Sequence, residues 1–201
     1  MREDAGLAPE LQQLRGVALE IWRDAAHRRA LLERLLSAWR TGDIPRATGV
    51  VEQIDDAIAT GLGLLRLPRG EPVGIEMVDG AHSWLARWDE PSRTIFIAVH
   101  AIEDALSERT KPDTVYQSWV HESLHARQPL HVLARSEYRS WRGYEEGLVT
   151  GLAESIVRRS ARMDPGQPFV RYYVVAYEAL ADILQLDAES LWRELWGYAP
   201  G

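Results

Sequence analysis

Apolar residues recur at helical spacing along the first third of the chain. This spacing predicts a helical segment over residues 8–40 and an amphipathic helix over residues 48–65. Residues 41–45, Thr-Gly-Asp-Ile-Pro, separate the two with turn-forming composition, and a stretch rich in Pro and Gly at 67–72 ends the second. The front third is therefore predicted to be a helical hairpin or a small subdomain.

The pattern changes in the middle of the chain, where three short apolar segments are typical of strands. They cover residues 73–78, 83–88 and 94–99, and the last of them, Thr-Ile-Phe-Ile-Ala-Val, is the most strongly apolar. Asp79-Gly80 between the first two is a hairpin signal. We therefore predict a small three-stranded, mostly antiparallel sheet connected as a meander.

Helical spacing returns after residue 100, and Asp187 is positioned to cap the last helix. The fold class predicted is α+β, with a helical N-terminal segment over 1–68 and a second domain over 69–201. The helices expected in the second domain cover residues 101–108, 113–128, 136–162, 168–185 and 188–197.

Composition narrows the chemistry. The chain has 201 residues, 46% of them apolar, and a net charge of −7, which argues against a nucleic-acid partner. It contains no Cys, so a metal site would have to use His, Asp or Glu. We find no signal-peptide pattern and no apolar run long enough to span a membrane, so we expect a cytoplasmic protein without a membrane partner.

The sequence Val-His-Glu-Ser-Leu-His-Ala at 120–126 contains the pattern His-Glu-x-x-His. Residues four apart lie on one face of a helix, so His121 and His125 can both present a ring nitrogen to one metal ion. Glu122 projects beside that ion, where a carboxylate can accept a proton from an attacking water. The pattern is short, and the alternative is a pair of histidines that only hydrogen-bond with their neighbours.

A catalytic zinc needs a third protein ligand, and the helix expected about twenty residues further on offers candidates. Glu145 and Glu146 are adjacent there and differ by one helical step of about 100°. Small residues follow at 147, 150, 151 and 153, and we expect them to let this helix approach the motif helix closely.

These two motifs resemble those of the gluzincins, zincin metallopeptidases in which a Glu on the following helix completes the zinc site. The resemblance covers roughly residues 94–160, and the family's Glu-Gly pair matches Glu146-Gly147. It implies a zincin-like fold and zinc bound by His121, His125 and Glu146, with Glu122 as general base. Some members carry an Asp four residues after the third ligand, where this chain has Thr150. Glu145 remains a rival ligand, and Glu154 fits a supporting or surface role better.

Peptide hydrolysis also needs a group that stabilises the developing oxyanion. Tyr173 is the preferred candidate; Tyr177 shares its helical face, and Arg127 and His131 are weaker candidates. The other three histidines have no partner at ligand spacing and are expected to be structural or exposed. The same resemblance implies that the strand at 94–99 runs along the cleft and pairs with an extended substrate; the alternative is an ordinary core strand, and both can hold for its two edges.

The function predicted from the sequence is a zinc-dependent metallopeptidase that acts on a peptide or protein substrate, of a kind encoded by bacteria and phages. The alternative is a catalytically silent protein of zincin fold with a structural or interaction role, such as a phage virion or assembly component. The N-terminal helices are a candidate surface for a protein partner in either case.

Overall fold

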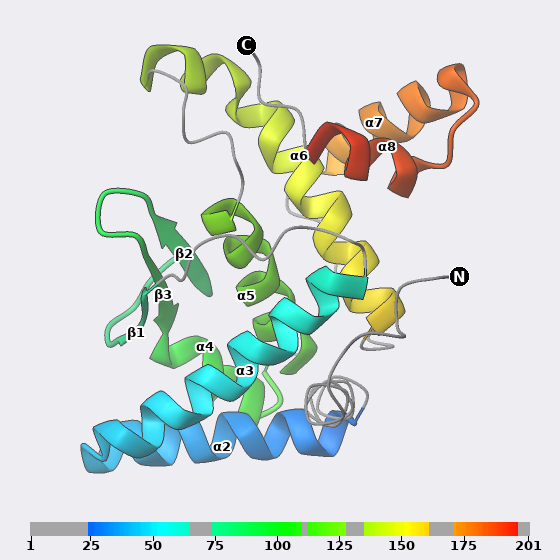
Figure 1. Ribbon diagram of the computed structural model, residues 1–201. Helices are drawn as coiled ribbons and strands as arrows, with labels where there is room; N and C mark the ends of the chain where they lie inside the picture. The colour runs from blue at the N-terminus through cyan, green and yellow to red at the C-terminus, as the bar shows by residue number, and fades with distance from the viewer. Residues whose placement is uncertain (1–23, 65–73, 110–111, 128–134, 161–170, 197–201) are drawn as a thin grey trace, which may run out of the picture.

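The computed structural model describes residues 24–64, 74–109, 112–127, 135–160 and 171–196. In these ranges the protein is α+β, as predicted, and mostly helical, with one open three-stranded sheet (Figure 1). None of the helices described is both long and apolar enough to cross a membrane. The elements are α2 (Ala25–Thr41), α3 (Ile44–Leu64), β1 (Gly74–Val78), β2 (Ala86–Asp89), β3 (Thr94–Ala98), α4 (Val99–Leu106), α5 (Pro112–Arg127), α6 (Arg135–Ser160), α7 (Arg171–Leu184) and α8 (Ala188–Trp196).

Helices α2 and α3 form the predicted hairpin, although α3 begins four residues earlier than expected. Gly42 ends α2 in the left-handed conformation (φ 69°), which a residue without a Cβ adopts at little cost. The Asp43 side chain then accepts a hydrogen bond from the backbone N–H of Arg46 (3.2 Å). Pro45 is tolerated in this first turn because its missing N–H would have no helical partner there. The turn and the next helix therefore overlap. The N-terminal part of the predicted 8–40 segment, before residue 24, lies outside the described residues.

The sheet has the order β1-β3-β2, which corrects the predicted meander. β1 pairs with β3 in parallel and β2 pairs with β3 antiparallel, so the sheet is mixed rather than mostly antiparallel. The turn at Asp79-Gly80 does not close a hairpin, because β1 and β2 are not neighbours in the sheet. β2 begins only at Ala86, and β3 lies between the two strands.

The true hairpin joins β2 to β3. Asp89 accepts hydrogen bonds from the backbone N–H (3.2 Å) and hydroxyl (2.6 Å) of Ser92, and Arg93 has a positive φ of 50° that completes the turn. The most apolar strand, β3, takes the central position, where both of its edges are hydrogen-bonded and its side chains Ile95 and Ile97 are fully buried. Local turn signals did not reveal this because burial of the most apolar strand decides the strand order.

Helix α5, which carries the His-Glu-x-x-His motif, lies at the centre of the molecule (Figure 1). It contacts β2, β3, α2, α4 and α6. Four of its apolar residues are at most 1% exposed: Val115, Trp119, Val120 and Leu124. The hydrophobic core around α5 is continuous with α2 and α3. A boundary between domains at residue 68 stays a prediction.

Two ion pairs fix α5 to the N-terminal helices. Arg28 in α2 binds Asp113 at the start of α5 (2.8 Å), and Arg127 at the end of α5 binds Asp55 in α3 (2.8 Å). Both arginines are nearly fully buried, and removing one partner of such a pair is destabilising because it leaves a buried charge without compensation. The two ends of the motif helix are therefore held by residues far away in the sequence.

The small residues of α6 do not all have the role expected of them. Thr150 faces α5, but Gly151 packs under the indole of Trp192 in α8. A Cβ at position 151 would lie 2.5 Å from Cε2 of Trp192, closer than a carbon contact allows. Gly151 thus lets α8 approach α6, on a different side of the helix from the motif.

Replacing Gly151 with Ala is expected to lower the free energy of unfolding by about 1–3 kcal/mol, because the buried Trp192 ring must move to admit the methyl group. Gly49 in α3 is a matched control, since a Cβ there meets no atom within 4 Å. Gly49→Ala should leave stability unchanged or raise it by up to about 1 kcal/mol. Urea denaturation followed by circular dichroism compares the two. Equal effects of the two variants would contradict the assigned packing.

Candidate metal centre

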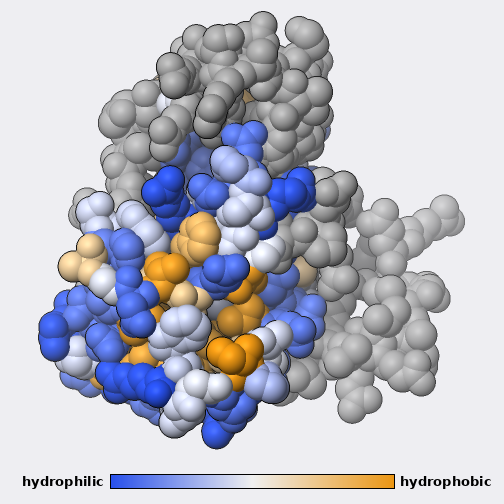
Figure 2. Space-filling model, turned by 90° about the vertical axis from the view of Figure 1, so that its left-hand side faces the viewer, coloured by the Kyte–Doolittle hydropathy of each residue, from blue (hydrophilic) through white to orange (hydrophobic). Residues whose placement is uncertain are grey.

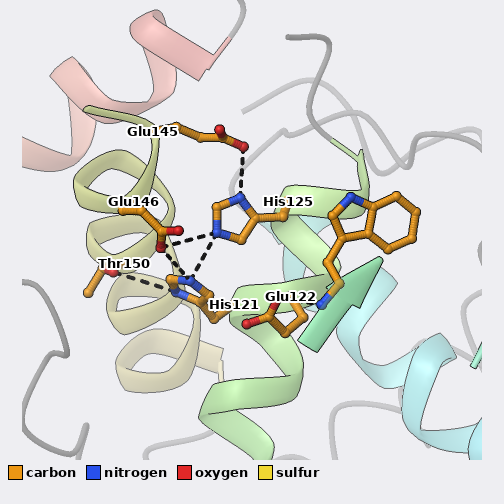
Figure 3. A network of polar contacts seen from close by, with 7 residues as sticks. His121, Glu122, His125, Glu145, Glu146 and Thr150 are labelled. Atoms are coloured by element: carbon orange, nitrogen blue, oxygen red, sulfur yellow. Dashed lines mark hydrogen bonds and ion pairs between the residues drawn. The ribbon is translucent and has the colours of Figure 1, made fainter. Parts of the chain in front are cut away.

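One face of α5 presents the two motif histidines to each other. Their Nε2 atoms are 3.0 Å apart, and the two rings meet edge to face with centroids 4.7 Å apart (Figure 3). His125 is buried and the His121 side chain is 11% exposed. The i, i+4 spacing therefore places two imidazole nitrogens at one point, as the helical pattern predicted.

Glu146 in α6 reaches the same point from the neighbouring helix. Its Oε2 lies 3.2 Å from Nε2 of His121 and 3.4 Å from Nε2 of His125 (Figure 3). Among the residues that the structure describes, these three form the one group of His, Asp and Glu side chains arranged to share a metal ion.

The spacing of the three atoms matches what a tetrahedral zinc site requires. Ligands about 2.0–2.1 Å from a tetrahedral ion lie about 3.3 Å from one another. The three separations in the cluster, 3.0, 3.2 and 3.4 Å, bracket that value. Two imidazoles and one carboxylate are also a donor set found in catalytic zinc sites, in which a fourth position takes water or substrate.

Glu145 occupies the other side of His125 and does not share the point where the three donor atoms meet. Its Oε1 lies 2.7 Å from Nδ1 of His125, and the residue is only 3% exposed. A carboxylate on Nδ1 fixes the ring orientation and leaves Nε2 to act as the metal ligand. In this geometry Glu146 is the candidate ligand, and Glu145 is a positioning residue, a role that the sequence did not suggest.

His121 has a weaker support of the same kind. The hydroxyl of Thr150 lies 3.5 Å from its Nδ1, at the limit of a hydrogen bond. The two histidines therefore have unequal supports: a charged carboxylate behind His125 and a neutral hydroxyl behind His121.

The side chains of the cluster form an ion-pair network. Burial lowers the pKa of His125, but hydrogen bonds to Glu145 and Glu146 and the negative charge of Glu122 outweigh it and raise that pKa to about 10. Burial likewise raises the pKa of Glu146, and the hydrogen bonds from the two histidines reverse this and hold it well below its usual range. The raised pKa of His125 and the lowered pKa of Glu146 both reflect the attraction between these closely spaced groups.

Glu122 lies beside the histidine pair, between it and β2 (Figure 3). Its Oε2 accepts a hydrogen bond from the backbone N–H of Trp88 (2.7 Å). This bond ties the carboxylate to the edge of the sheet and limits its rotation. Glu122 is therefore close to the cluster without being one of its three converging groups; its role as general base stays a prediction.

Two of the remaining catalytic candidates are described by the structure, and neither joins the cluster. Tyr173 belongs to α7, but its side chain lies outside the described part, as does the whole of His131. Arg127 forms the ion pair with Asp55, and Tyr177 packs against the hydrophobic core. Glu154 is buried two turns beyond Glu146, 4.0 Å from Arg158.

The three other histidines agree with the expected structural or exposed roles. His27 is exposed. His82 stacks on Trp84 with centroids 4.3 Å apart, and the His82 and His100 rings lie 6.2 Å apart.

The strand next to the cluster is β2, which corrects the role expected of residues 94–99. β3 is hydrogen-bonded to a neighbour on both sides, so it has no edge left for a substrate. β2 is an edge strand and contacts α5, with Trp88 beside Glu122. The apolar run that made β3 the strongest strand in the sequence is also what buried it in the middle of the sheet.

Comparison with models of protein families, with curated proteins and with solved structures finds no match for this chain.

Proposed function

We propose that this protein is a zinc-dependent metallopeptidase of the gluzincin type, in which His121, His125 and Glu146 hold the metal. The observation that carries the proposal is the convergence of three donor atoms from two helices within 3.4 Å of one another. The carboxylate behind His125 and the position of Glu122 add support, because a histidine cluster with no metal role needs neither.

The proposed reaction is hydrolysis of a peptide bond by water. Zinc held by the three ligands would polarise the substrate carbonyl and make water more acidic. Glu122 accepts the proton of the attacking water and delivers it to the nitrogen of the leaving amine. The N–H of Trp88 holds one carboxylate oxygen of Glu122 (2.7 Å), so the base keeps one orientation during both transfers. Tyr173 as the stabiliser of the oxyanion stays a prediction.

The outer edge of β2 is the proposed backbone partner of the substrate, with pairing through Ala86 and the carbonyl of Trp88, because the N–H of Trp88 is already bonded to Glu122. The carbonyl of Leu85 accepts from Ala98 of β3, so in an antiparallel pair the backbone groups of Ala86 and Trp88 point the other way. The bond from Trp88 to Glu122 agrees with this direction. An extended peptide added along this edge would pass beside Glu122 and the cluster.

Metal content and peptide cleavage together test the proposal. The full chain, loaded with zinc and dialysed, is expected to retain about one zinc per molecule by elemental analysis. Incubation with a mixed peptide library, followed by mass spectrometry, should reveal cleavage products that disappear after the metal is removed with a chelator. Absence of a tightly held metal would contradict both the metal site and the reaction. A metal without any cleavage would favour the alternative, a silent structural or interaction protein of the same fold.

A further inference from the structure

β1 forms the edge of the sheet opposite to β2, the strand that contacts Glu122, and an apolar groove lies beside it. Figure 2 shows hydrophobic residues gathered among hydrophilic ones on the face that contains it. An open groove of about 260 Å³ separates β1 from helices α2 and α3. Its lining includes Trp39 of α2, Thr48 and Val51 of α3, and Ile75, Glu76 and Met77 of β1.

The free edge of β1 borders this groove. The N–H of Gly74 donates to the carbonyl of Arg93 at the start of β3 (2.9 Å), so residues 74, 76 and 78 direct their backbone groups toward β3. The N–H and C=O groups of Ile75 and Met77 therefore point outward. In the part of the chain that the structure describes, β1 pairs with no strand on that side.

The side chains of β1 differ in polarity between the two faces of the sheet, and this difference indicates which side chains a partner strand would need. Ile75 and Met77 direct their side chains to the face of the sheet that lines the groove. Glu76 also borders the groove, but strand alternation places its exposed side chain on the opposite face, beside Phe96. The basic residue in that row, Arg87, is one strand further away on β2, about 10 Å from β1. The edge therefore offers apolar space on one face and a negative charge on the other.

We propose that this edge binds an extended segment of a partner protein in which apolar residues alternate with a basic residue. The segment adds a strand to β1 through the backbone groups of Ile75 and Met77. Its apolar side chains enter the groove, and a Lys or Arg stands directly across from Glu76. The groove is smaller than the roughly 300–1,000 Å³ typical of sites for drug-sized molecules, which fits a few aliphatic side chains better than an enclosed ligand.

A second copy of this chain fits the same edge poorly. In the antiparallel register that uses the outward groups of both Ile75 and Met77 in each copy, Ile75 would lie opposite Met77 of the other copy and Glu76 opposite Glu76. Two like charges directly across a strand pair are destabilising, whereas a basic residue there is attractive. The charge on this edge thus discriminates against self-association and in favour of a basic partner.

The proposed surface is independent of the metal centre, because β3 separates β1 from β2. The test uses the full chain labelled with ¹⁵N and two blocked heptapeptides, one alternating Ile with Lys and the other alternating Ile with Glu. The expected result is that the Lys peptide slows hydrogen exchange of the Ile75 and Met77 amides, and that the Glu peptide binds at least about fivefold more weakly. Absence of protection at both amides would overturn the proposal.

Three variants distinguish the contribution of the apolar groove to peptide binding from the contribution of the charge on Glu76. Thr48 is exposed and lines the groove, so Thr48→Trp should fill it and weaken the Lys peptide about tenfold or more without disturbing the core. Glu76→Lys should reverse the preference toward the Glu peptide, whereas Glu90→Lys, the same charge change on the β2–β3 turn, should leave the preference as it was. If Glu76→Lys left the preference for the Lys peptide unchanged, Glu76 would not select the partner, and the proposed basic partner would be refuted.

Discussion

The variant Glu122→Gln is expected to lower kcat for peptide hydrolysis by about 10³-fold while zinc content stays at one per chain. The amide of Gln cannot accept a proton, but it can still accept the hydrogen bond from the backbone N–H of Trp88. The fold and the three ligands are therefore preserved, and only the proton transfer is lost. Single-turnover cleavage of a peptide substrate, with elemental analysis of the same sample, measures both quantities.

Glu90→Gln is a matched control for this variant. Glu90 is exposed on the turn between β2 and β3, so its replacement changes the same chemical group without reaching the cluster. Its activity should equal that of the unmodified chain. If Glu122→Gln kept full activity, hydrolysis would have to use another base and the proposed role of Glu122 would be wrong.

The second large effect concerns the two adjacent glutamates of α6. Glu146→Ala removes one of three candidate ligands and is expected to weaken zinc binding by about 10²–10³-fold. A structural zinc site with four ligands binds with about 10–16 kcal/mol, which corresponds to about 3–4 kcal/mol for each ligand. Glu145→Ala leaves all three ligands and removes only the carboxylate on Nδ1 of His125 (2.7 Å). A loss of about 10–100-fold is typical for such a supporting partner. Competition with a chromogenic zinc chelator measures both affinities.

Two further variants make this comparison sharper. Glu145→Gln keeps an oxygen that can accept from Nδ1 of His125, so it should recover part of the affinity lost in Glu145→Ala. Glu154→Gln changes a buried glutamate of the same helix outside the cluster, so its zinc affinity should be unchanged. Tight zinc binding in Glu146→Ala, with a larger loss in Glu145→Ala, would reverse the two assignments.

The sequence predicted the local structure of the site well because local structure depends on nearby residues. Helical spacing alone placed His121 and His125 on one face of a helix, and the helix lies within one residue of its predicted bounds. The pairing of Glu146 with them was implied by resemblance, and the distances of 3.2 and 3.4 Å agree with it. The prediction that Asp187 caps the last helix is also confirmed, since its Oδ1 accepts a hydrogen bond from the backbone N–H of Ser190 (2.9 Å).

Interactions between distant segments were not accessible from the sequence pattern. Two adjacent glutamates on one helix look equivalent until the position of α5 is known, and only then does Glu145 lie behind His125 while Glu146 joins the donor atoms. The same holds for Gly151. Its missing side chain could allow close approach of either α5 or α8, and the structure shows that it is α8 that packs against it, through Trp192.

By itself, the sequence determined the order and approximate position of the described helices and strands, and that two histidines and an acid share one helix. These features follow from backbone periodicity, capping and turn chemistry, which act over a few residues. The tertiary structure alone decided that β3 is central, that β2 presents its edge beside Glu122, and that β1 opens on an apolar groove. These depend on which surfaces exclude water from one another, and packing of that kind joins residues that no short pattern connects.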